Sequence, residues 1–143
     1  MKVVFIGSSS FGLKCLQEIN SIIEIDVVGV VSSPREFKIS YSKNKIKNVL
    51  FSDFSDFCIE QGIEYTIIKN GMSDEGLFEK IKNWEPDIFI VAGWYHMIPR
   101  KWLEYRKSYG LHASLLPDYS GGAPLVWAMI NGERKTGITF FQM

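Results

Sequence analysis

The fold class follows from one stretch near the start of the chain, Val3-Val4-Phe5-Ile6-Gly7-Ser8-Ser9-Ser10-Phe11-Gly12. Its first four residues form a short, continuous apolar run, which is typical of a buried parallel strand. After a turn rich in glycine and serine, apolar residues recur at helical spacing, at Phe11, Cys15, Leu16, Ile19 and Ile22 or Ile23. A second buried strand is predicted over residues 25–31. This strand–helix–strand unit predicts a right-handed crossover in a parallel sheet.

The same alternation continues through the rest of the chain. Further strands are predicted over residues 65–68, 87–92, up to Leu111-His112, and over 136–143. Helices are predicted from Phe54 to a stop at Gly62, from an N-cap at Ser73 to Pro86, after Pro99, and over 123–131. The pattern predicts one α/β domain over residues 1–143, doubly wound around a mostly parallel, Rossmann-like sheet. The last strand would be an open edge, so the natural domain is expected to be longer, with more chain or another subunit covering it.

Composition and charge exclude several classes of function. The hydrophobic fraction of 46% and the charged fraction of 22% are ordinary for a globular soluble protein. The formal net charge is zero, so neither a nucleic acid nor an anionic membrane is expected as the main partner. Cys15 and Cys58 lie in apolar helical patterns and are predicted to be reduced, and two histidines without clustered carboxylates predict no metal site. No signal peptide or membrane span is found, so a cytoplasmic location is expected.

Residues 110–122 have the composition of a binding-site wall. An apolar lead brings His112 to the end of a predicted strand, and Ser114 follows two residues later. Pro117 fixes one backbone angle, whereas Gly121 and Gly122 allow another group to approach the backbone closely. Because this strand neighbours the one that ends before residue 93, the two strand ends are expected to converge on one crevice. His112 is therefore predicted to be functional, while Ser114 either faces the crevice or caps the loop.

The loop of residues 93–99 is the second candidate wall. It contains Trp94, Tyr95, His96 and Met97, and planar, polarizable side chains in a loop suit a flat heteroaromatic ligand. The alternative is that Trp94 and Met97 close the end of the core. Both interpretations can hold, because such side chains often pack inward while their backbone faces a ligand.

Two other loops carry weaker indications. The turn of residues 7–12 lies where such folds bind phosphate, with Ser9 and Ser10 as candidate ligands. It lacks the dinucleotide and P-loop spacings, so a tight turn with serine caps is favoured over a phosphate site. Residues 32–48 are rich in lysine and are interpreted as an exposed excursion, with contact to an anionic substrate as the alternative.

Three motifs in the second half of the chain resemble the signature of the folate-dependent formyltransferases. They are His112-Ala113-Ser114-Leu115-Leu116-Pro117, Gly121-Gly122-Ala123-Pro124 and Gly137-Ile138-Thr139. The family includes methionyl-tRNA formyltransferase, glycinamide ribonucleotide formyltransferase and the sugar-nucleotide N-formyltransferases. Residues 93–99 resemble its folate loop, and residues 121–127 are closer to the sugar and tRNA branches than to the purine branch. The resemblance extends over essentially the whole chain, which is identified as the N-terminal part of the family's catalytic domain.

The resemblance implies 10-formyltetrahydrofolate as cofactor and a primary amine as acceptor. The family's catalytic set is an asparagine, a histidine and an aspartate, and His112 matches the histidine, which would hydrogen-bond the oxyanion formed when the amine attacks the formyl carbon. The asparagine position is Gly110 and the aspartate falls after Met143, so little or no turnover is expected of this chain alone. The expected cofactor-binding residues are Trp94, Tyr95, His96, Met97, Ile98, Leu115, Leu116 and Pro117, and the expected substrate-binding residues are Ser9, Ser10, Ser114, Gly121 and Gly122.

The leading hypothesis is thus formyl transfer to an amino sugar nucleotide or to methionyl-tRNA, with the neutral charge disfavouring tRNA. The first alternative is a non-catalytic module that holds folate or a nucleotide. A nucleotide-binding oxidoreductase domain is a third hypothesis, which rests on the fold class alone. No membrane partner is expected, and a homo-oligomer is compatible with the sequence.

Overall fold

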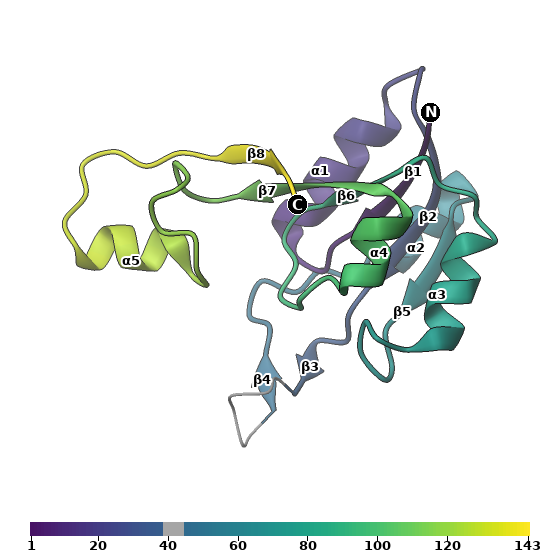
Figure 1. Cartoon of the computed structure of the whole chain (residues 1–143), viewed down its shortest axis with the longest axis horizontal. Helices are drawn as coiled ribbons and strands as arrows, with labels where there is room; N and C mark the ends of the chain where they lie inside the picture. The colour runs from purple at the N-terminus through teal and green to yellow at the C-terminus, as the bar shows by residue number, and fades with distance from the viewer. Residues whose placement is uncertain (39–44) are drawn as a thin grey trace.

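A six-stranded sheet forms the centre of the molecule, in the order β5-β2-β1-β6-β7-β8 (Figure 1). The computed structural model describes residues 1–38 and 45–143. The strands of the sheet are β1 (Lys2–Ile6), β2 (Asp26–Ser32), β5 (Glu64–Ile67), β6 (Ile88–Val91), β7 (Lys107–His112) and β8 (Thr139–Gln142). The strands from β5 to β7 run parallel, and β8 pairs antiparallel with β7. The predicted doubly wound, mostly parallel sheet is confirmed.

The strand order contains one change of direction. From β1 the chain proceeds outward to β2 and β5 on one side, and then returns to place β6 and β7 on the other side of β1. The carboxyl ends of β1 and β6 therefore border the topological switch point, the place where ligands bind in sheets of this kind. A ligand site is therefore expected among the loops after β1, β6 and β7.

The core has two halves, because alternate residues of a strand face opposite sides of the sheet. Val4 and Ile6 of β1 are fully buried against α3 (Glu75–Lys82) and α4 (Arg100–Tyr105), which lie on the same side of the sheet in Figure 1. Phe5, between them, is buried on the other side against α1 (Ser10–Asn20) and α2 (Ser55–Gln61). Both cysteines are free, and Cys58 belongs to the second half of the core.

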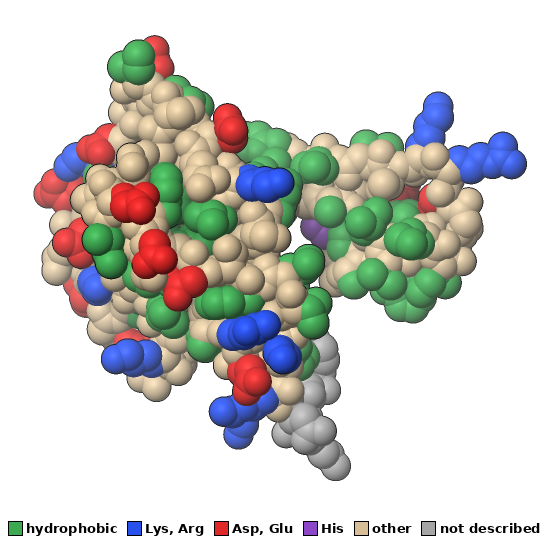
Figure 2. Space-filling view, turned by 180° about the vertical axis from the view of Figure 1, so that it is seen from behind, with side chains coloured by type: hydrophobic (Ala, Val, Ile, Leu, Met, Phe, Trp, Pro, Cys, Tyr) green, Lys and Arg blue, Asp and Glu red, His purple; other side chains and the backbone are tan. Residues whose placement is uncertain are grey.

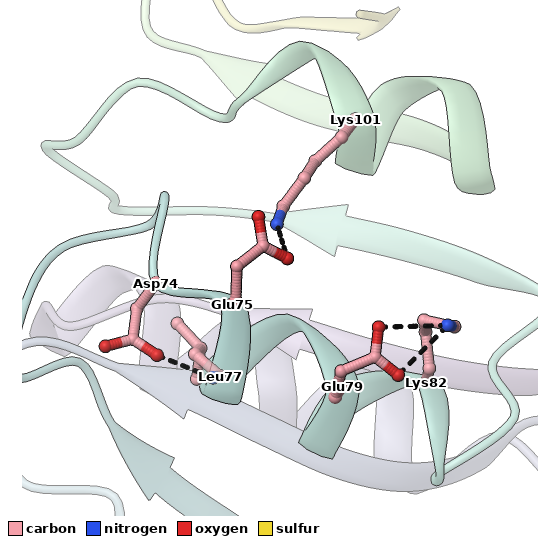
Figure 3. A network of polar contacts seen from close by, with 6 residues as sticks. All are labelled: Asp74, Glu75, Leu77, Glu79, Lys82 and Lys101. Atoms are coloured by element: carbon pink, nitrogen blue, oxygen red, sulfur yellow. Dashed lines mark hydrogen bonds and ion pairs between the residues drawn. The ribbon is translucent and has the colours of Figure 1, made fainter.

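Polar contacts fix α3 and join it to α4 (Figure 3). The predicted N-cap, Ser73, is wrong by one residue: Asp74 is the cap, and its Oδ1 accepts a hydrogen bond of 2.9 Å from the backbone N–H of Leu77. Asp74 has the extended backbone of an N-cap, and the helix begins at the next residue. An ion pair of 2.6 Å joins Glu75 of α3 to Lys101 of α4.

The predicted apolar stripe of α1 is only partly correct. Leu16 is fully buried, but Phe11 is 42% exposed and Ile23 is 98% exposed. The helix ends at Asn20, and the N–H of Ser21 bonds back to the carbonyl of Gln17, so the chain has already turned toward β2 when it reaches Ile22 and Ile23. A helix that ends early removes the later positions of its stripe from the buried face.

The described parts of the segment 32–48, residues 32–38 and 45–48, are less exposed than predicted. They carry a small antiparallel hairpin of β3 (Glu36–Phe37) and β4 (Ile46–Lys47), apart from the main sheet. Phe37 and Asn48 are buried, which corrects the prediction of a wholly exposed excursion. Lys38, Lys45 and Lys47 are exposed as expected, and Lys43 lies outside the described residues.

The segment between β7 and β8, residues 113–138, extends away from the sheet and is called the arm below (Figure 1). It contains α5 (Pro124–Ile130), followed by Gly132 in a left-handed conformation, as the sequence predicted for the end of this helix. Five large apolar side chains of α5 are more than half exposed: Leu125, Val126, Trp127, Met129 and Ile130. Across the described ranges, no helix is both long enough and apolar enough to span a membrane.

Candidate functional site

A hollow of about 380 Å³ opens at the carboxyl ends of β6 and β7. Its wall combines residues from the loop after β6, from the end of β7 and from β8 and its continuation: Val91, Gly93, Trp94, His96, Met97, Ile98, Leu103, Leu111, His112, Ser120, Phe141 and Met143. Because β6 and β7 are neighbouring parallel strands, their carboxyl ends lie at the same edge of the sheet. The predicted convergence of these two strand ends on one crevice is confirmed.

His112 is the polar side chain that β7 brings to this hollow. It is half-buried, and its Nε2 lies 2.7 Å from the backbone carbonyl oxygen of Tyr119. A carbonyl oxygen only accepts hydrogen bonds, so we assign the proton to Nε2, which leaves Nδ1 of the neutral ring as an acceptor. The ring also meets Phe141 of β8 edge-on, with 6.4 Å between ring centroids. The imidazole is thus held in one orientation, with a proton that it can donate and a nitrogen that can accept one.

The loop after β6 supplies the flat part of the wall. The rings of Trp94 and His96 lie 5.0 Å apart, and Trp94 also packs against the core beneath α3 and α4. Within the described part of the chain, Trp94 Nε1 and His96 Nε2 are shielded from solvent and have no hydrogen-bond partner. Burial lowers the pKa of His96, so its ring is neutral at neutral pH. The aromatic surface of this loop suits a planar ligand.

The other members of this loop lie at the margin of the hollow. Met97 lines it but is 89% exposed, which excludes the alternative that Met97 closes the end of the core. Ile98 lines the hollow and packs on the core, as Trp94 does. Tyr95 is 48% exposed and does not line the hollow.

Ser114 caps its own loop. The side chain is fully buried, and its hydroxyl donates a 2.6 Å hydrogen bond to the carbonyl of Asp118. This is the second of the two interpretations drawn from the sequence, and it corrects the expectation that Ser114 faces the crevice. The backbone carbonyl of Ser114 in turn accepts a bond of 2.7 Å from the hydroxyl of Thr139. The start of the arm is therefore tied to β8.

The remaining candidates from this segment do not line the hollow. Leu115 is 54% exposed and lies over Gly137, where a Cβ atom would come within 2.5 Å of its side chain. Leu116 and Pro117 are part of the same turn, and the N–H of Leu116 bonds to the Thr139 hydroxyl at 3.1 Å. Gly121 and Gly122 lie on the arm, with open space where a side chain would be. The assignment of these five residues to cofactor or substrate binding stays a prediction, and the geometry of the hollow does not support it.

The turn of residues 7–12 is covered by the chain that follows β4. Ser9 is the N-cap of α1, and its buried hydroxyl accepts a 3.2 Å hydrogen bond from the N–H of Gly12. The N–H of Ser10 bonds to the carbonyl of Leu50 at 2.9 Å, and the side chain of Asn48 bonds to the carbonyl of Ser8 at 3.1 Å. The donors expected to hold phosphate are thus used within the protein. A tight turn with serine caps, the favoured interpretation, is the arrangement observed.

Gly93 lets the loop after β6 come close to the turn of residues 7–12. A Cβ atom on Gly93 would overlap the hydroxyl of Ser9, and Gly93 has a φ of +62°, in the left-handed region. Glycine at this position therefore lets the loop after β6 lie directly against the N-terminus of α1. The wall that carries Trp94 and His96 depends on this contact.

Side chains of Phe141 in β8 and of Met143 directly after it lie over Gly110. A Cβ atom at this position would come within 2.6 Å of Met143 Cε and 3.0 Å of the Phe141 ring. The space that a side chain would need is thus filled by two residues that also line the hollow. A larger residue here would require the flexible end of Met143 and the ring of Phe141 to move.

A second, larger hollow of about 660 Å³ lies at the opposite edge of the sheet. Its lining includes Lys2, Glu85, Asp87 and Arg106, near the amino ends of β1, β6 and β7. Lys2 and Glu85 already form an ion pair of 3.1 Å there. Because doubly wound sheets bind ligands at the carboxyl ends of their strands, the smaller hollow is the candidate site. Residues 1–38 and 45–143 contain no group of histidine, cysteine and carboxylate side chains that could hold a metal ion.

Comparison with known proteins identifies the family. A family model described as formyl transferase matches residues 1–143. The chain belongs to the formyl transferase family. Methionyl-tRNA formyltransferase of Clostridioides difficile (strain 630) is 35% identical over 146 residues, which cover 100% of this chain and 45% of that protein. Methionyl-tRNA formyltransferase of Mycoplasma genitalium is 33% identical, with 99% of this chain and 44% of that protein covered.

Solved structures agree with the fold. Phosphoribosylglycinamide formyltransferase from Anaplasma phagocytophilum superposes with a TM-score of 0.73 at 19% identity, covering 100% of this chain and 64% of that one. A sugar N-formyltransferase from Shewanella sp. has a TM-score of 0.64 at 16% identity, covering 100% of this chain and 51% of that one. This chain spans less than half the length of the curated formyl transferases that it matches.

Five wall residues of this formyl transferase chain are among the predicted site residues: Trp94, His96, Met97, Ile98 and His112. Sequence reasoning missed Phe141 and Met143, because their place depends on β8 turning back to pair antiparallel with β7. It also missed Leu103, for which the sequence contains no indication, and it did not single out Ser120 within the predicted wall of residues 110–122. Leu111 could have been found, since it directly precedes His112 at a strand end.

Proposed function

We propose that this formyl transferase chain binds 10-formyltetrahydrofolate in the hollow at the ends of β6 and β7. The observation that carries the proposal is that Trp94, His96 and His112 line the same hollow. The residues fit the group, because a planar heterocycle can lie against the aromatic rings of Trp94 and His96 in the wall of the hollow. When bound, this cofactor supplies the formyl group.

His112 is the proposed catalytic residue. Its Nε2–H, which donates to the Tyr119 carbonyl here, can donate instead to a substrate oxygen that gains negative charge during transfer. The Phe141 ring lies edge-on beside it and limits how far the imidazole can turn. Loss of one donor of this kind typically slows a reaction by about 10²–10³-fold.

The proposed acceptor is a primary amine on an amino sugar nucleotide or on methionyl-tRNA. Support for tRNA comes from the methionyl-tRNA formyltransferases among the curated relatives. Support for a smaller acceptor comes from the formal net charge of zero, because binding tRNA requires many basic contacts to phosphate. The acceptor of the whole protein is therefore to be found by assaying both classes.

One observation favours a second candidate function, that of a folate-binding unit which does not itself transfer the formyl group. Phe141 and Met143 fill the space above Gly110, so that position offers only backbone to the site. An oxyanion in the hollow would then depend on His112 without help from a side chain at residue 110. Binding without transfer is the expected behaviour under this alternative.

Calorimetric titration with 5-formyltetrahydrofolate, a stable analogue of the labile cofactor, tests the binding step. We expect saturable binding by the wild-type chain and unchanged affinity in Tyr95→Phe, which alters one exposed hydroxyl of the same loop. No binding by a folded chain would contradict the proposed site.

A transfer assay separates the two candidate functions. Formation of tetrahydrofolate from the 10-formyl cofactor is followed with an amino sugar nucleotide and with methionyl-tRNA as acceptors. If the wild type transfers formyl, His112→Ala should lose about 10²–10³-fold in kcat, and near wild-type turnover would refute the role of His112. Assayed on a protein extended past Met143, binding without detectable transfer to either acceptor would favour the non-catalytic alternative.

A further inference from the structure

The β3–β4 hairpin contacts the candidate site through an aromatic side chain, whereas the sequence suggested only contact of its lysines with an anionic substrate. Each of its strands has only two residues, and it is separate from the six-stranded sheet. An isolated hairpin of this size has little stability of its own in water, so its place depends on what it packs against. Its buried side chain is Phe37, which is 8% exposed.

Phe37 packs on the loop that forms the flat wall of the hollow. Its ring centroid lies 4.5 Å from that of His96, with an angle of 51° between the ring planes, and 6.1 Å from that of Tyr95. On its other side, His96 lies 5.0 Å from Trp94. Aromatic pairs attract one another at these separations. Three rings, Phe37, His96 and Trp94, therefore connect the hairpin to the wall of the hollow.

This arrangement holds two polar atoms in a costly state. Neither Trp94 Nε1 nor His96 Nε2 has a hydrogen-bond partner among the described residues, although both atoms are shielded from solvent. Buried polar atoms of folded proteins nearly always have a partner, from the protein, from ordered water or from a ligand. An indole N–H can only donate, whereas a neutral imidazole nitrogen either donates or accepts. A ligand in the hollow can lie against these rings without reaching either nitrogen, so the place of the rings depends on the neighbours that pack on them.

We propose that Phe37 is a positioning residue of this site, which holds the His96 ring in the wall against which a planar heteroaromatic ligand in the hollow can lie. The inference rests on the proposed function, which it deepens by assigning the hairpin to the ligand-binding wall. Without the Phe37 ring, His96 can rotate and take up water, and a ligand must then displace that water and fix the ring again. The effect reaches the ligand through His96 rather than by direct contact.

The state of His96 in the ligand-free protein gives the first test. Burial is the cause of its lowered pKa, and the chain has two histidines, so nuclear magnetic resonance can follow His96 and His112 separately. In Phe37→Leu the pKa of His96 should rise toward an ordinary value of about 6.5, because water reaches the ring. Phe37→Tyr keeps the ring and should leave that pKa unchanged. Phe57→Leu is the matched control, since Phe57 is a partly buried phenylalanine that packs on the other half of the core.

Binding of 5-formyltetrahydrofolate gives the second test. Phe37→Leu should bind about tenfold more weakly than the wild type, as expected for the loss of one aromatic pair, whereas Phe37→Tyr and Phe57→Leu should bind normally. An unchanged His96 pKa together with unchanged affinity in a folded Phe37→Leu protein would overturn the proposal. If the wild type binds no folate, the proposed function fails, and the His96 titration still decides whether Phe37 positions this ring.

Discussion

The six-stranded sheet with its flanking helices, called the body here, differs from the arm in what surrounds its apolar side chains. In the body, β1 is paired on both sides and covered by helices on both faces, so Val3, Val4, Phe5 and Ile6 are fully buried. The arm has no such layers: α5 keeps Ala128 buried and exposes the large apolar side chains around it. Figure 2 shows hydrophobic side chains gathered on the projecting arm. Apolar sequence produces a core only where sheet and helices enclose it on two sides.

The family motifs and the hollow lie mostly in different regions of the molecule. The part of the chain that resembles the family most closely, residues 110–139, lies mostly on the arm, yet the hollow is built largely by the body. His112 belongs to both regions, because it ends β7 and bonds to Tyr119 of the arm. The conformation of the site therefore depends on how the arm leaves the sheet at this residue.

The two regions should differ most in the stability lost when a tryptophan is replaced by alanine. Trp102 of α4 is fully buried between Phe78 and Phe89, whereas Trp127 of α5 is 53% exposed. Trp102→Ala should lower the free energy of unfolding by about 3–5 kcal/mol, because it leaves a cavity in a packed core. Trp127→Ala should change it by about 0.5 kcal/mol or less. Urea unfolding of both variants checks the comparison, and similar losses would show that the arm is packed as firmly as the body.

A smaller difference is expected between two glycines. A Cβ atom on Gly29 of β2 would overlap the ring of Trp84, whereas a Cβ atom on Gly121 of the arm would meet nothing within 4 Å. Gly29→Ala should destabilise the protein by about 1–3 kcal/mol through overpacking. Gly121→Ala should be neutral or stabilise it by up to about 1 kcal/mol, since it restricts the unfolded chain. Thermal unfolding of the pair measures the difference, and a tolerated alanine at residue 29 would contradict close packing of Trp84 on β2.

The smallest effect, absent near neutral pH, concerns a buried thiol in the body. Burial raises the pKa of Cys58 from an ordinary value of 9.0 to about 11. Above pH 9 the unfolded chain loses this proton while the folded chain keeps it, so stability is complete below pH 9 and falls as the pH rises toward 11. Cys58→Ala removes the contribution of this thiol and should make the fall shallower. Urea unfolding at pH 8 and at pH 10.5 tests this, and an unchanged slope in Cys58→Ala would refute it.

Where sequence prediction failed, the failures have a common physical cause. Hydrophobic period and turn chemistry predicted the strands, the order of elements and the place of His112, since these depend on neighbouring residues. Ser73 was one residue from the true cap, because Ser73 and Asp74 are both good capping residues and the start of the helix decides between them. The bonds of Ser8 and Ser10 backbone groups to residues 48–50 join positions about forty residues apart in the chain. Periodicity contains no information on such contacts.

By itself, the sequence determined that this protein has a doubly wound α/β sheet, that it resembles the formyltransferases, and that His112 lies at a strand end next to a loop of aromatic residues. These features depend on local pattern, because side-chain period and turn residues act over a few positions. Only the tertiary structure decided that Phe141 and Met143 lie over Gly110 and that Phe37 packs on His96. Each of these contacts follows from how strands and loops distant in the sequence meet at one edge of the sheet.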